Sequence, residues 1–149
     1  MSDFVTIRAI VGTEPQLTIT ATGVAVLKFR AATHESKRDA DTGQWSDGPT
    51  SWYSVSAFRA LAENAMESIR QGDHLVIHGK LQIRQFDRAD GTRGTSADVE
   101  ALALGHDLKF GTSAFTKVRA PGAEAQRAAH EDGSQETAAT WPPVDAEAA

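Results

Sequence analysis

The residues with the clearest chemical potential are aromatic side chains in segment 43–58, which reads Gly-Gln-Trp-Ser-Asp-Gly-Pro-Thr-Ser-Trp-Tyr-Ser-Val-Ser-Ala-Phe. A polar, turn-forming loop leads into an alternating strand whose bulky members are Trp52, Val55 and Phe58, and Arg59 follows. Rings on a sheet with cations nearby form a surface on which unpaired bases stack while their phosphates are neutralised. The alternative is that these rings are ordinary core, because aromatic residues dominate protein cores.

Patterns for catalysis, cofactors or metals are missing from the sequence, so we expect no enzyme activity and no catalytic, cofactor or metal site. His74 and His78 lie four apart on a predicted strand, about 13 Å along one face, which is too far to share a metal. The glycines at 91 and 94 lack the lysine of a phosphate loop and fall in a predicted hairpin. Cysteine is absent, which excludes disulfides and thiolate catalysis.

Length and composition predict one globular domain with a tail. The 149 residues leave room for a domain of about 110 residues and a short extension. No run of apolar residues approaches a membrane span, and segment 1–4 has no basic stretch before an apolar one. Together with the lack of cysteine, this predicts a cytoplasmic protein without a membrane partner.

The net charge of −5 argues against tight, indiscriminate binding to duplex DNA, which depends on phosphate contacts. The charge is uneven, however. Residues 113–149 contain 3 cations and 6 anions, which leaves 12 cations and 14 anions in residues 1–112. A nearly neutral domain can still hold a basic groove, because the local field depends on where the charges lie.

Three strands are predicted before the only convincing helix. They cover residues 2–12, with a short extension at 17–21, then 24–33 and 51–58. A change in alternation near Leu27 and Lys28 predicts a bulge. Residues 34–50 form a long polar connection that is either functional or disordered, and the solitary Trp45 favours a functional loop.

The helix is predicted over residues 60–70, where apolar residues recur at helical spacing. A long strand follows over 74–87 with a kink at Gly79, then a hairpin turn at 90–94 and a last strand at 96–104. The composition shifts after Gly111 to a polar, Ala-rich segment without periodicity, so we predict a domain at 1–112 and a disordered tail at 113–149.

This order, β-β-β-α-β-β, predicts an all-β OB-fold: a five-stranded Greek-key barrel with one helix between strands three and four. The fold hosts many functions, so it supports a functional hypothesis without deciding it.

The chain resembles bacterial single-stranded DNA-binding proteins, the homotetrameric SSB family, and most of all actinobacterial members. The matching segments occur in the family's order over residues 4–110: Ile10-Val11-Gly12, Gly23 to Phe29, Ala32 to Ser36, Asp41 to Trp45, Leu61 to Ala65, Gly72 to Leu81 and Arg84-Gln85-Phe86. The resemblance implies sequence-independent binding and protection of single-stranded DNA in replication, recombination, repair or DNA uptake. The alternative is an OB-fold protein-interaction or replication-restart module with weak DNA binding.

The resemblance implies that Trp52, Phe58 and Phe86 stack on bases. Lys37 stands where better-studied members have a further stacking tryptophan, so it replaces a ring contact with a charge contact, and Trp45 either compensates or packs the loop. The cations expected to meet phosphates are Lys28, Arg30, Arg59, Lys80, Arg84, Arg88 and Arg93.

The family's acidic tail tip ending in Pro-Phe has no counterpart here, where the sequence ends Val144-Asp145-Ala146-Glu147-Ala148-Ala149. Trp141-Pro142-Pro143 is the only tail segment typical of an interaction motif. We therefore expect reduced recruitment of replication and repair enzymes through the tail, as in an accessory or paralogous member.

Overall fold

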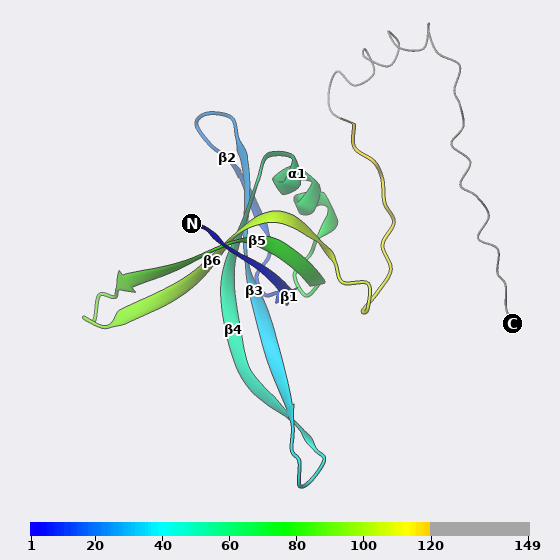
Figure 1. Ribbon diagram of the computed structural model, residues 1–149. Coiled ribbons are helices and arrows are strands. Elements are labelled where there is room, and N and C mark those ends of the chain that lie inside the picture. Colours follow the sequence, from blue (N-terminus) through cyan, green and yellow to red (C-terminus); the bar gives the residue numbers. More distant parts are fainter. Residues whose placement is uncertain (120–149) are drawn as a thin grey trace, which may run out of the picture. The chain divides into compact units, whose positions relative to one another are not determined.

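Alternating side chains produce the long strands of this protein, as β3 shows: Leu27, Phe29 and Ala31 are buried, whereas Lys28 and Arg30 are exposed. Figure 1 shows the computed structural model, which describes residues 1–119. Its elements are β1 (Asp3–Val11), β2 (Gln16–Ile19), β3 (Ala25–Arg38), β4 (Trp45–Phe58), α1 (Arg59–Ser68), β5 (His74–Asp87) and β6 (Arg93–His106).

The strands form one sheet in the order β1-β5-β6-β4-β3-β2, and a further pairing between β1 and β3 closes it into a barrel. The closing pairs are Ile10 with Ala32 and Val11 with Ala31. The largest fully buried side chains of the interior are Leu27, Ile69, Leu75, Ile77, Val11, Val55 and Val99. The expected OB-fold is confirmed, with the helix between β4 and β5, and the predicted short extension is the separate strand β2.

Helix α1 covers one end of the barrel and contacts β2, β3, β4 and β6. It buries Ala62 and Ala65, and Ile69 follows directly as a core residue. The predicted helix at 60–70 was close, but the observed one ends at Ser68. Arg70 therefore lies beyond the helix, where its guanidinium donates to the carbonyl oxygens of Met66 at 3.0 Å and Ile69 at 2.8 Å.

The polar connection predicted over 34–50 is wrong: most of it is strand. β3 continues to Arg38, and β4 already begins at Trp45, so only a short turn joins them. Asp39 and Gln44 close this turn with a hydrogen bond of 2.8 Å, and Gly43 adopts a φ of 69°. The hydrogen bonds between two strands join backbone groups and need no apolar side chains. A hairpin that extends beyond the core therefore shows no alternation of apolar and polar residues, and its strands cannot be recognised from the sequence.

The bulge predicted near Leu27 and Lys28 is also wrong. Pairing between β3 and β4 is regular from Val26 to His34, and the register shifts only between His34 and Ser36. Val26 and Leu27 are both buried although they point to opposite faces, because Leu27 joins the main core and Val26 is covered outside it. Two consecutive buried residues therefore require no irregularity here.

β5 and β6 form the second long hairpin. The kink predicted at Gly79 is confirmed by a register shift between His78 and Gly79. β6 starts at Arg93 and not at the predicted Ser96, because Arg93 already pairs with Asp87. The Asp90 carboxylate accepts from the hydroxyl of Thr92 at 2.6 Å and from its N–H at 3.0 Å, and these bonds hold the pKa of Asp90 below its ordinary value. Both hairpins extend beyond the barrel, in different directions (Figure 1).

Met1–Ser113 forms one compact unit. Among the described residues, no helix is long and apolar enough to cross a membrane. The expectations about Trp141-Pro142-Pro143 and the chain's end concern residues outside the described ones.

Candidate nucleic-acid interface

One outer face of the sheet brings together side chains from β3, β4, β5 and β6. Directly paired residues point to the same face of a sheet, so the register identifies its members. Three residue pairs between β3 and β4 belong to this face, and the parallel pairing of Ser54 with Asp98 extends the face to β6. The three pairs are Lys28 with Ser56, Arg30 with Ser54 and Ala32 with Trp52. We call this surface the central face.

Trp52 lies on the central face and packs closely against Gly12. A Cβ on Gly12 would overlap with the Trp52 ring, so the indole packs directly on the Gly12 backbone. The Arg30 guanidinium lies 5.0 Å from the ring centroid. Nevertheless 46% of Trp52 remains exposed. An exposed indole beside a cation is able to stack on a base while the cation approaches its phosphate.

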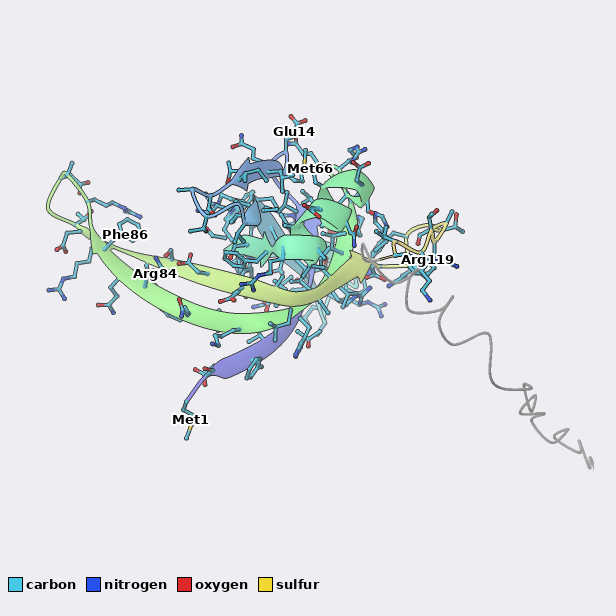
Figure 2. The ribbon with its side chains drawn as sticks, turned by 90° about the horizontal axis from the view of Figure 1, so that it is seen from above. Met1, Glu14, Met66, Arg84, Phe86 and Arg119 are labelled. Carbon is cyan, nitrogen blue, oxygen red and sulfur yellow. The ribbon has the colours of Figure 1, made fainter. Side chains whose placement is uncertain are left out.

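Phe86 repeats this arrangement on the β5–β6 hairpin. It pairs with Gly94, and a Cβ there would overlap with the Phe86 ring. The ring is 45% exposed, and the Arg88 guanidinium lies 5.8 Å from its centroid. Figure 2 shows Arg84 and Phe86 along this hairpin, with Phe86 nearer to the turn. The hairpin therefore carries a second half-exposed ring that packs against a glycine.

A groove of about 650 Å³ runs across the central face. Lys28, Arg30 and Arg84 line it and supply its positive charge. Asp98 also lines it and forms an ion pair with Arg84, with an Nε–Oδ2 distance of 3.0 Å. Glu14 is a second carboxylate in the lining, so the three cations exceed the two carboxylates by one. The groove keeps a small net positive charge, which suits a phosphate backbone.

Phe58 lies where β4 meets α1, and it is 39% exposed. Its partner Val26 belongs to the same face as Lys28. The neighbouring Val55, the third bulky residue of the strand, is instead buried in the core, because an odd separation places it on the inner face. Arg59 is exposed and has a φ of 58°, the only positive φ of a non-glycine residue in the part of the chain that the structure describes.

The outer part of the β3–β4 hairpin separates Trp45 from Lys37. Trp45 is 70% exposed and pairs with Arg38, whereas Lys37 pairs with Ser46, so the two lie on opposite faces of this hairpin. The register shift between His34 and Ser36 gives β4 one extra residue, which turns Trp45 to the face of His34. Trp45 thus shares the face of Trp52 despite their odd separation.

The two remaining predicted cations lie on β5 and β6. Lys80 is half-buried and pairs with Glu100 and Phe4, whereas Arg93 is exposed at the hairpin turn and lies 3.7 Å from the Asp87 carboxylate. The structure thus gathers Lys28, Arg30 and Arg84 around one groove, with Trp52 beside Arg30. Phe86, Arg88 and Arg93 lie further out on the hairpin.

Sequence reasoning missed the three residues that shape this surface without being rings or cations. Gly12 and Gly94 support the two aromatic rings, and Asp98 neutralises Arg84. The available signal was a glycine inside or beside a predicted strand, which often marks a close approach of another group.

Comparisons with known proteins agree with this geometry. A sequence profile of the single-strand binding protein family matches residues 3–107. "Single-stranded DNA-binding protein 2" of Tropheryma whipplei is 38% identical over 113 residues, which are 76% of this chain and 74% of that protein. A protein of the same name from Streptomyces avermitilis is 42% identical over 115 residues, 77% of this chain and 72% of that protein. The crystal structure of a small single-stranded DNA-binding protein from Streptomyces coelicolor matches with a TM-score of 0.66 and 36% identity, over 74% of this chain and 98% of the other.

Proposed function

The chain belongs to the single-strand binding protein family, and on that premise we propose that it binds and protects single-stranded DNA without regard to sequence. The observation that carries this proposal is the pair of half-exposed rings, Trp52 and Phe86, each resting on a glycine and each accompanied by an arginine. Every base has a π-face, so stacking tolerates any sequence and contributes about 1–3 kcal/mol per base.

In this proposal Trp52, Phe58 and Phe86 stack on bases, and the cations of the groove meet the phosphates between them. Lys28 and Arg30 contact phosphates on the central face, and Arg84 and Arg88 contact phosphates along the β5–β6 hairpin. The other contributors from the predicted set are Lys37, Trp45, Arg59, Lys80 and Arg93. Because the rings lie on different elements, a bound strand runs from the central face out along β5–β6.

We further propose that the protein is a homotetramer that acts on single strands exposed in the nucleoid during replication, recombination, repair or DNA uptake. Exposed apolar side chains support self-association, among them Phe4 on β1 and Leu102 on β6. Several barrels in one particle let a strand wrap over more than one of them, which raises affinity through effective concentration.

Fluorescence anisotropy of labelled poly(dT) and of a duplex of equal length tests the function. We expect the single strand to bind much more tightly, with the logarithm of affinity falling by about 0.7 per neutralised phosphate for each logarithmic unit of salt. Equal affinity for the duplex overturns the proposal. A flat salt response favours the protein-interaction module instead.

Alanine variants of the three rings locate the site. Trp52→Ala and Phe86→Ala should each lower affinity by about fivefold or more, in line with the loss of stacking on one base. Phe58→Ala should do the same without a large fall in melting temperature. A strong fall in melting temperature with unchanged affinity of the folded fraction would assign Phe58 to the core.

A further inference from the structure

A row of paired residues leads from Trp52 around the barrel to His74 on β5. Trp52 pairs with Ala32, Ala32 with Ile10, and Ile10 with His74. These pairs cross from β4 over β3 and β1 to β5. Neighbouring strands lie about 4.8 Å apart, so His74 is about 14 Å from Trp52 along this row. Between them lie only the buried Ala32 and the half-buried Ile10.

At the end of this row a second aromatic surface is built. The Phe110 ring stacks on the His74 ring, with 3.7 Å between centroids and 13° between planes. Phe110 is nevertheless 55% exposed. The turn that carries it is fixed, since the Asp107 N–H donates to the His74 carbonyl at 2.9 Å and the Phe110 N–H donates to the Asp107 carbonyl at 3.1 Å.

A hollow of about 410 Å³ is lined by Ala32, Ile10 and His74 of this row and by Phe110, and its charged lining is suited to an anion. Arg8 and Lys109 contribute two positive charges, His34 and His74 contribute imidazoles, and Asp107 is the single carboxylate. Asp107 is paired with Arg8 through Nη2 at 2.7 Å and Nε at 2.7 Å. The Lys109 ammonium lies 5.8 Å from the Phe110 centroid and completes the same combination of ring and cation that surrounds Trp52 and Phe86.

We propose that Phe110 and His74 form an additional stacking platform for single-stranded nucleic acid. The strand leaves Trp52, crosses Ala32 and Ile10, and places a further base on Phe110 while Arg8 and Lys109 contact the phosphates in the hollow. This inference rests on the proposed function, because it extends the same ligand beyond the central face.

Phe110→Ala and oligo(dT) of increasing length test the platform. Labelled strands of about 4 to 16 nucleotides cover the range of site sizes known for single OB-folds. We expect Phe110→Ala to bind the shortest strands as the unmodified protein does and to lose about fivefold or more in affinity once the strand is long enough to reach beyond Ile10. Lys109→Gln should show the same length dependence with a lower salt slope. Leu108→Ala, an exposed apolar neighbour in the same turn, is the matched control and should leave all affinities unchanged.

If Phe110→Ala and the unmodified protein bind strands of every length equally well, the proposed platform is wrong. The proposed main function still stands in that case if Trp52→Ala loses affinity. If the unmodified protein binds no single strand at all, the proposed function itself is wrong. Photocrosslinking of 5-iododeoxyuridine strands to the unmodified protein gives a readout that does not depend on any variant. Mapping of the crosslink to Phe110 or His74 supports the platform, and crosslinks confined to Trp52 and Phe86 contradict it.

Discussion

Trp52 and Phe86 each pack against a glycine backbone, and each stays about half exposed. A methyl group at Gly12 or Gly94 has no room, since its position is already taken by ring atoms. An alanine there forces the ring to tilt away from the sheet. The two glycines therefore influence the orientation of these two exposed rings, although neither glycine has a side chain of its own.

Gly94→Ala should accordingly weaken single-strand binding by about fivefold or more, because it displaces one stacking ring. The matched control is Gly105→Ala on the same strand, where an added Cβ meets no atom within 4 Å. Anisotropy titration with labelled poly(dT) measures both variants. Unchanged affinity of Gly94→Ala, with Phe86 shown to be displaced by a crystal structure, would show that this ring does not stack on bases.

Asp98 restrains Arg84 on the groove. The ion pair between them occupies part of the guanidinium and offsets its charge. Asp98→Asn should therefore raise the affinity for poly(dT) at low salt. The slope of log affinity against log salt concentration should become more negative by up to about 0.7, the value for one further phosphate contact. Glu63→Gln, which removes an exposed carboxylate on α1, controls for net charge alone. Equal gains in both variants would mean that only the overall charge matters.

Among the elements, the turn after β6 is held to β1 by one ion pair. The Arg8 guanidinium, together with the Lys109 N–H, keeps the pKa of Asp107 below its ordinary value. A carboxyl whose pKa is lowered by folding stabilises the fold fully above its unfolded pKa, about 3.9, and loses this contribution as the pH falls through the folded pKa.

Asp107→Asn should thus lower the melting temperature at neutral pH, and the difference from the unmodified protein should shrink below about pH 4. Thermal unfolding followed by circular dichroism between pH 3 and pH 7 provides the measurement. Glu14→Gln, which changes a carboxylate outside any described ion pair, should show no such trend. A difference for Asp107→Asn that stays constant down to pH 3 would contradict a role for its charge.

The barrel could be predicted from the sequence because each of its strands buries one face. Apolar and polar residues therefore alternate along these strands in the sequence. Leu27, Phe29 and Ala31 show this on β3. The hairpin beyond His34 could not be predicted, because its residues are exposed on both faces and its ladder uses backbone groups alone. The same limit applies to the site: Trp52 is visible in the sequence, but its support by Gly12, distant along the chain, depends on the closure of β1 against β3.

For the molecule as a whole, the proposed tetramer is tested by the mass of the protein in solution. Light scattering coupled to size exclusion should give a mass about four times 15.9 kDa. Phe4→Asp should reduce this mass, because it places a charge among exposed apolar side chains of β1 and β6, while Ile19→Asp on β2 should leave it unchanged. A monomer mass for the unmodified protein at micromolar concentration would rule out the tetramer.

The glycine supports beneath Trp52 and Phe86 also bear on the thermodynamics of binding. A ring packed closely against a glycine backbone samples few rotamers before the ligand arrives, so little side-chain entropy remains to be lost on association. The ordering cost then falls mainly on the nucleic acid, whose stiffness differs with its sequence. Differences in affinity among homopolymers should therefore reflect the stacking propensity of the free strand more than any preference of the protein.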